Sequence, residues 1–175
     1  MNGCPDVCDM HTLPILLCTV ALSVTGFGKD LDADQVAKDC AVERDDFNKT
    51  VRVFCPKIQG DNVSEYLEFS RLTDAEGQLH WFVMLRTRRD TDDGWAMWAT
   101  VSDEHRVEFK LRQQDNDMKS GWLIEECSAS LSREYLDSVK KTGIKWRVYG
   151  KNVTKDWAIP AALVQGFLKR CDTLK

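Results

Sequence analysis

Two short apolar runs, residues 79–85 and 95–101, are the strongest feature of the hydrophobic pattern along the chain. Each run has consecutive rather than alternating apolar residues, which indicates a strand buried on both faces. The polar segment between them ends in Asp92-Asp93-Gly94, a sequence typical of turns. We therefore expect a central β-hairpin whose polar turn spans residues 86–94. The side chains expected to be largely inaccessible to solvent are Trp81, Val83, Leu85 and Met97.

Alternating apolar and polar residues predict further strands around this hairpin. Residues 50–55 and 66–72 alternate before it, and residues 107–111 and 122–129 alternate or are apolar after it. Short strands separated by turn signals are typical of antiparallel sheets. Residues 66–129 together therefore predict an antiparallel meander of about five strands.

Capping signals place helices on either side of these strands. Asp32 is positioned to cap a short helix, with Gln35 three residues later as in a capping box. Ser132 is a second candidate N-cap, and Gly143 is positioned to end the helix that follows it.

The last quarter of the chain predicts two short strands and a final helix. The strands are expected at residues 144–148 and 157–159, and Pro160 fits the first position of the helix. The apolar stripe of that helix consists of Leu163, Val164, Phe167, Leu168 and Cys171. The expected fold class is α+β, with an antiparallel meander of about five to seven strands and a C-terminal helix–strand–strand–helix segment packed on it.

The first 28 residues differ from the rest of the chain. Residues 15–24 form a ten-residue apolar core, and small residues follow it up to Gly28. This pattern is typical of a secretory signal peptide, and the core is too short for a transmembrane helix. No Lys or Arg precedes the apolar core, whereas signal peptides have a positively charged segment there. The alternative hypothesis is that this segment is a buried N-terminal strand or helix. We expect residues 1–28 to be removed and residues 29–175 to form a single α+β domain without a transmembrane anchor, exported to the periplasm or the extracellular space.

Four cysteines follow the leader: Cys40, Cys55, Cys127 and Cys171. They contain no Cys-x-x-Cys pair, which argues against a zinc ribbon or a thioredoxin-like motif. An oxidising compartment would pair them as disulfides. We favour Cys127 with Cys171, because Cys127 leads directly into the last quarter of the chain, and hence Cys40 with Cys55. A buried free thiol at Cys171 is the alternative.

The span 127–168 contains a Cys-x-Ala sequence, a predicted helix, a predicted strand and Gly166-Phe167 near its end. In these elements it resembles the C-terminal part of the invasion-associated locus B family of small exported bacterial proteins. The resemblance covers this span alone and implies no function here.

Charge and motifs exclude several function classes. The formal net charge is −4 and there is no long basic run, so a nucleic-acid partner is not expected. His80 and His105 could each act as a general base, but no G-x-S-x-G, H-E-x-x-H or Walker sequence accompanies them. We therefore assign no catalytic residue and expect no cofactor.

Acidic residues offer two further kinds of site. Residues 90–94 and 115–117 carry oxygen ligands at alternate positions, as calcium loops do, but neither completes an EF-hand, and no metal site is expected. Glu125 and Glu126 are neighbours on a predicted strand, so they point to opposite faces and cannot form a catalytic pair. One of them is expected to point inward and to need a partner.

The remaining candidates are for binding. We expect an interaction surface at the tip and strands of the hairpin, formed by Arg86, Arg88, Arg89, Trp95 and Trp98, with a solvated loop as the alternative. The leading hypothesis is an exported, non-enzymatic protein that binds another protein. The alternative hypothesis is a small secreted hydrolase that uses His80 or His105 with a nearby carboxylate.

Three N-x-S/T sequences, at Asn48, Asn62 and Asn152, fall in predicted loops. They are acceptors for N-linked sugars only in a host that glycosylates its secreted proteins.

Overall fold

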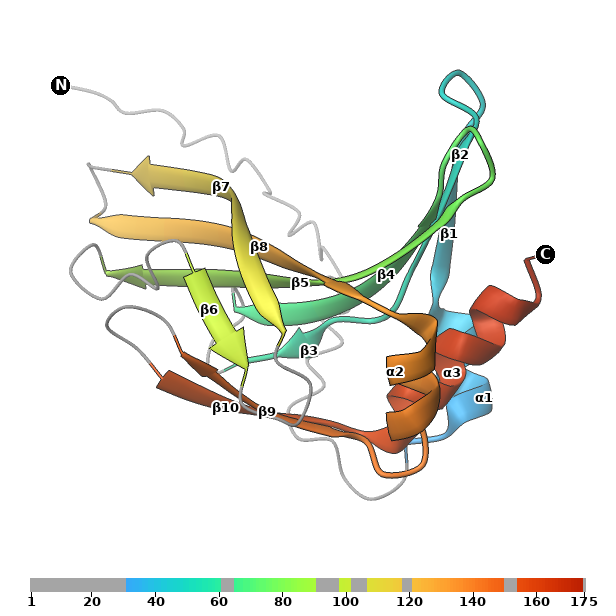
Figure 1. The fold of residues 1–175 in the computed structure, drawn as a ribbon. Coiled ribbons are helices and arrows are strands. Elements are labelled where there is room, and N and C mark those ends of the chain that lie inside the picture. Colours follow the sequence, from blue (N-terminus) through green and yellow to red (C-terminus); the bar gives the residue numbers. More distant parts are fainter. Residues whose placement is uncertain are drawn as a thin grey trace, which may run out of the picture.

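The computed structural model describes residues 31–60, 65–90, 98–101, 107–117, 121–149 and 154–174 (Figure 1). For residues 89–90, 98–101, 111–117 and 122 the description is of the backbone alone.

Within these residues the chain forms three helices and ten strands. The helices are α1 (Ala33–Asp39), α2 (Arg133–Val139) and α3 (Ala161–Asp172). The strands are β1 (Ala41–Asp45), β2 (Thr50–Phe54), β3 (Ile58–Gln59), β4 (Tyr66–Thr73), β5 (Leu79–Asp90), β6 (Trp98–Val101), β7 (Glu108–Asp117), β8 (Trp122–Leu131), β9 (Ile144–Tyr149) and β10 (Thr154–Ile159).

All these strands belong to one antiparallel sheet in the order β1-β2-β4-β5-β8-β7-β6-β9-β10, and β3 pairs with β4 beside β2. The sheet curves so that β9 and β10 lie below β4 and β5, and the three helices gather at one end (Figure 1). The expected α+β class is confirmed, and so is the C-terminal helix–strand–strand–helix segment, α2–β9–β10–α3.

The predicted hairpin between residues 79–85 and 95–101 is wrong. Strand β5 continues to Asp90 and pairs with β4 and β8, whereas β6 pairs with β7 and β9. The segment after Leu85 looked like a turn because it is polar. Its side chains nevertheless alternate as in a strand, with Thr87 buried between the half-buried Arg86 and Arg88.

Strand β5 is fully buried on one face only. Trp81, Val83 and Leu85 are buried as predicted, but Phe82 and Met84 on the opposite face are half-buried. Met97 lies outside the described residues. The sheet therefore has an inner face that forms the core and an outer face that is partly open.

Aromatic side chains join the last helix to the inner face of the sheet. The ring of Phe167 lies 5.6 Å from that of Trp81 and 5.9 Å from that of Phe69. Trp146 of β9 packs between Phe69 and Phe109, at 6.2 and 6.1 Å. These contacts connect both ends of the strand order through one core, which explains why the sheet curves instead of lying flat.

A buried arginine fixes the end of α3. Arg71 is 3% exposed, and its Nη1 donates to the backbone carbonyl of Cys171 at 2.7 Å. Its guanidinium lies 5.9 Å from the ring centre of Trp81. A cation at the C-terminal end of a helix is favourable because the helix dipole is negative there.

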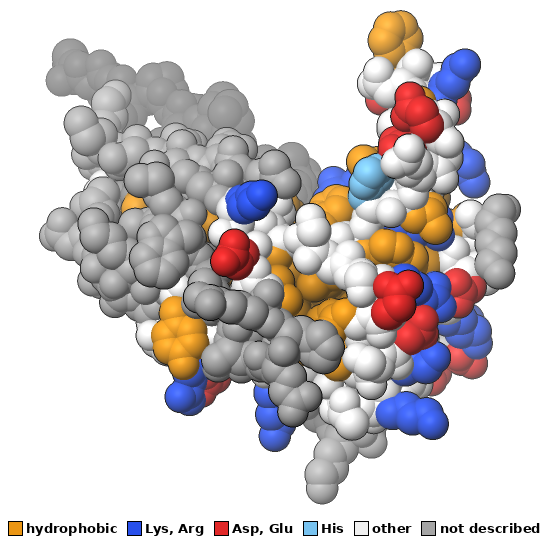
Figure 2. All heavy atoms as spheres, in the orientation of Figure 1, with side chains coloured by type: hydrophobic (Ala, Val, Ile, Leu, Met, Phe, Trp, Pro, Cys, Tyr) orange, Lys and Arg blue, Asp and Glu red, His pale blue; other side chains and the backbone are white. Residues whose placement is uncertain are grey.

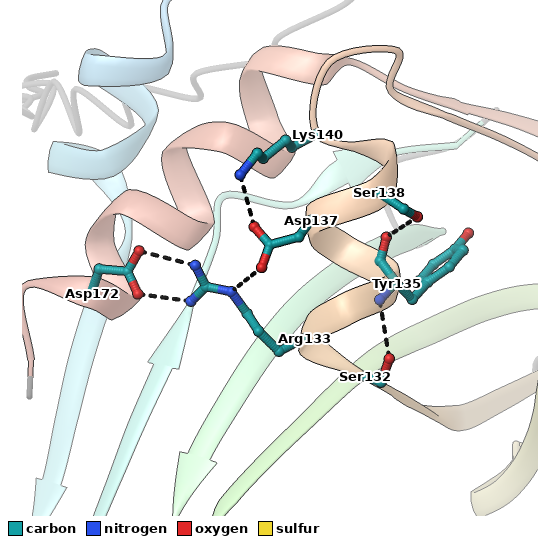
Figure 3. Close-up of polar contacts among 7 residues, drawn as sticks. All are labelled: Ser132, Arg133, Tyr135, Asp137, Ser138, Lys140 and Asp172. Atoms are coloured by element: carbon teal, nitrogen blue, oxygen red, sulfur yellow. Dashed lines mark hydrogen bonds and ion pairs between the residues drawn. The ribbon is translucent and has the colours of Figure 1, made fainter.

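A second arginine links α2 to α3 at the surface (Figure 3). Arg133 donates to both carboxylate oxygens of Asp172, at 2.7 and 3.0 Å, and to Asp137 at 2.8 Å. These bonds raise the pKa of the Arg133 guanidinium and lower that of the Asp137 carboxyl. Lys140 also contacts Asp137, at 2.9 Å, so each charge in this group has a partner.

Three predicted helix boundaries are confirmed. Asp32 caps α1 through the backbone N–H of Asp34, and Ser132 caps α2 through that of Tyr135. Gly143 has φ +73°, a conformation that suits glycine, and its N–H closes the end of α2. The capping box is wrong, because the side chain of Gln35 donates to Asp39 instead.

Trp81→Ala should reduce the free energy of unfolding by about 3–5 kcal/mol, the usual cost of removing a buried aromatic ring. Phe82→Ala, its neighbour on the outer face, should cost only about 1–2 kcal/mol, because that ring is half-buried. Urea unfolding of both variants measures the difference. Equal losses would mean that the two faces of β5 are equally buried.

Gly166→Ala should also destabilise the protein, by about 1–3 kcal/mol. A Cβ atom there would lie 2.5 Å from Cβ of Val36 and 2.7 Å from the carbonyl oxygen of Ala33, so α1 would be forced away from α3. In a helix interior without this contact, the same substitution stabilises by about 1 kcal/mol. The sign of the change in urea unfolding therefore tests the helix contact directly.

Candidate functional site

A groove of about 520 Å³ lies at the start of β5, lined by outer-face residues together with Leu79, Trp81 and Leu131, which have the inner-face parity. It runs over β4, β5 and β8, and its lining residues are Leu72, Leu79, His80, Trp81, Phe82, Met84, Ser128, Ser130 and Leu131. Figure 2 shows hydrophobic side chains at the base of the β1–β2 hairpin and the adjoining turn between β4 and β5.

Strand register explains why the outer face is hollow here. Phe82 is paired with Ser70 on one side and with Ser130 on the other, and Met84 is paired with Glu68 and Ser128. Because serine side chains are small, they leave space beside the large apolar side chains of β5. Side chains of β5 alternate between the two faces of the sheet. Because Trp81, Val83 and Leu85 point into the core, Phe82 and Met84 point into the groove.

His80 lies at the edge of the groove and is paired with a carboxylate. Its Nε2 is 2.7 Å from Oδ2 of Asp74, whose Oδ1 accepts the backbone N–H of Gln78 at 2.7 Å. The hydrogen bond from His80 is the main reason why the pKa of the Asp74 carboxyl is lowered. The side chain of His80 is 51% exposed, so the pair is open to solvent. His105 lies outside the described residues.

The predicted binding residues are not gathered at a hairpin tip. Arg86 and Arg88 lie within β5, and Arg86 forms an ion pair of 3.2 Å with Glu126 of β8. They do share the outer face with the groove, since they continue the alternation of Phe82 and Met84. Trp95 and the side chains of Arg89 and Trp98 lie outside the described part of the structure.

The protein buries several charged side chains, and the sequence predicted only one of them, an inward-facing glutamate at position 125 or 126. Glu125 faces inward and is 1% exposed, while Glu126 faces outward, as expected for neighbours on a strand. Glu125 is paired with the buried Thr87, and Glu65 lies just before β4. Nζ of Lys155 in β10 is 2.6 Å from Oε2 of the buried Glu65.

The Glu65–Lys155 pair joins the two ends of the curved sheet, because β10 is its last strand and β4 is near its first. Ninety residues separate the two partners, so no local pattern could have predicted the contact. A Cβ atom at Gly60 would lie 2.5 Å from Oε2 of Glu65, so this glycine is needed where the chain passes the carboxylate.

All four cysteines of the described chain are buried free thiols, and no disulfide is formed. The Sγ atoms of Cys40 and Cys55 are 2.9 Å apart. Burial raises the pKa of the Cys55 thiol, that of Cys127 to about 11 and that of Cys171 to about 12. Thiols with raised pKa values are poor nucleophiles at neutral pH, so these residues suit structural rather than catalytic roles.

The expected pairing of Cys127 with Cys171 stays a prediction. Cys127 pairs with Leu85 of β5, whereas Arg71, whose side chain contacts the Cys171 carbonyl, pairs with Trp81 four residues away along that strand.

No family model, curated protein or solved structure matches the chain. The resemblance of residues 127–168 to the invasion-associated locus B family is therefore not supported by a match. Among the described residues, no three His, Cys, Asp or Glu side chains are grouped as a metal site requires. No helix in the described ranges is long and apolar enough to cross a membrane.

Replacing His80 by Ala should raise the pKa of Asp74 towards its ordinary value of 3.8. A carboxyl group whose pKa is lower in the folded than in the unfolded protein stabilises the fold at pH values above its ordinary pKa. This stabilisation is lost as the pH falls through the lowered, folded-state pKa. The variant should therefore lose this contribution. Carboxyl-carbon NMR titration measures the shift, with Asp137, which pairs with Arg133, as an internal control that should not change. An unchanged Asp74 titration would show that the His80 contact is absent in solution.

Proposed function

We propose that the protein is exported and that it binds another protein through the groove over β4, β5 and β8. The observation that carries this proposal is the set of large apolar side chains at a hollow surface. Phe82 and Met84 are half-buried on the outer face, and Leu79, which is 52% exposed, lines the groove from the start of β5. Contiguous apolar side chains that are partly exposed in this way are typical of interaction sites.

The shape of the groove suits an extended segment of the partner. Its floor follows β5 from His80 to Met84, a distance of roughly 13 Å for four residues of a strand. Apolar side chains of a bound segment would pack on Phe82 and Met84. Ser130, an exposed residue of the groove lining, would exchange a hydrogen bond with the segment's backbone. Arg86 and Arg88 would extend the same surface beyond the groove.

Binding can be tested by affinity capture from the native extract, followed by mass spectrometry. Phe82→Asp and Met84→Asp should each reduce capture of the partner at least about tenfold, because a charged group cannot be buried in an apolar contact at low cost. Lys141→Asp, at an exposed position outside the groove, is the matched control and should capture normally. Equal capture by all three variants, with unchanged thermal stability, would contradict the proposal.

For the exported form we propose a disulfide between Cys40 and Cys55. Their thiols already lie 2.9 Å apart, and the bond would connect the end of α1 to the end of β2. Non-reducing peptide mapping of the secreted protein should recover Cys40 linked to Cys55. Recovery of Cys40 or Cys55 as a free thiol, or linked to Cys127 or Cys171, would contradict the proposal.

A hydrolase is the second candidate, favoured by the His80–Asp74 pair at the edge of the groove. A histidine held by a carboxylate is the arrangement of a general base. A panel of p-nitrophenyl esters from acetate to hexanoate is a suitable probe. A hydrolase should lose activity at least about 100-fold in His80→Ala. Equal hydrolysis by the wild-type protein and this variant would exclude the candidate.

A further inference from the structure

The tip of the β1–β2 hairpin points to a second site, separate from the groove. We propose that Asn48 carries an N-linked oligosaccharide in the exported protein. This inference rests on the export part of the proposed function, because sugars are added to asparagine during export. It does not depend on what the groove binds.

The acceptor sequence lies at an exposed turn of the described chain. Asn48-Lys49-Thr50 is an N-x-T sequence, and Asn48 is exposed in the turn between β1 and β2. Lys49 has φ +53°, so the chain reverses there. The hairpin extends away from the body of the protein (Figure 1), which leaves room for a large substituent.

The turn can keep its hydrogen bonds when the sugar is attached. The Nδ2 atom of Asn48 would bond to the anomeric carbon of a lipid-linked oligosaccharide, with loss of one amide proton and of the lipid diphosphate. One N–H remains on Nδ2, and it can still donate to Oδ2 of Asp45, now at 2.7 Å. The backbone N–H groups of Phe47 and Asn48 also donate to Asp45, at 3.0 Å each, and do not involve the modified atom.

Two surface features next to Asn48 would be covered by the sugar. Phe47 is 93% exposed, which is unusual for an aromatic side chain, and the apolar face of a pyranose can pack on its ring. Strand β1 is the edge of the sheet, with mostly exposed side chains. A hydrated glycan at the tip would hinder edge-to-edge pairing with another chain.

The test is peptide mapping of the protein purified from its native source, from both the exported fraction and the remaining cell extract. Treatment with peptide N-glycosidase in ¹⁸O-labelled water converts a glycosylated asparagine to labelled aspartate. We expect the label at position 48 in the exported protein. An exported protein with unmodified Asn48 would overturn this inference and leave the proposed export intact. A protein found in neither the exported fraction nor a glycosylated form would overturn both.

Variants expressed in the same source separate the glycan from the turn. Thr50→Val removes the hydroxyl that the acceptor sequence requires but keeps the Asn48–Asp45 bond, and it should abolish the label at position 48. Thr50→Ser retains the hydroxyl and should retain the label. The Thr50→Val protein should unfold normally but should aggregate faster on concentration. Equal aggregation of the two variants would show that the glycan does not cover the exposed tip and edge strand.

Discussion

The packing of Phe167 against Trp81 and Phe69 is the contact on which the rest of the fold depends. A sheet of this many strands must cover one face, and α3 supplies the largest apolar stripe that the described helices offer. Arg71 then fixes the end of α3 through the Cys171 carbonyl. Once this helix is in place, β9 and β10, which lie between α2 and α3 in the chain, are drawn beneath β4 and β5, and the sheet curves around the core.

The same constraint creates the outer surface. Because side chains alternate along a strand, burying Trp81, Val83 and Leu85 in the core places Phe82 and Met84 on the opposite face. Ser70, Ser128 and Ser130 in the neighbouring strands leave a hollow beside these two side chains. The candidate binding site is thus a direct consequence of how the core is filled, which links the proposed function to the fold.

Local signals in the sequence were sufficient to predict several helix ends and the apolar stripe of the last helix. The caps at Asp32 and Ser132, the glycine at 143 and the stripe around Phe167 each depend on residues within one or two helical turns. Inward and outward positions within single strands were also predictable from alternation. These features determine the fold class.

Strand partners were not predictable, because pairing is decided by residues far apart in the chain. The polar end of β5 has a turn-like composition, yet it is held as a strand by β8, some forty residues later. The Glu65–Lys155 pair and the closeness of Cys40 to Cys55 depend in the same way on the completed sheet. The groove was missed for this reason, since it needs three strands side by side in register.

Hydroxyl-radical footprinting tests the central claim, that one face of β5 is core and the other is a binding surface. In the isolated protein, Met84 and Phe82 should be oxidised readily and Trp81 should be protected. With the captured partner bound, Met84 and Phe82 should become protected while Trp81 does not change. Protection of Met84 in the isolated protein, or equal oxidation with and without the partner, would contradict the account.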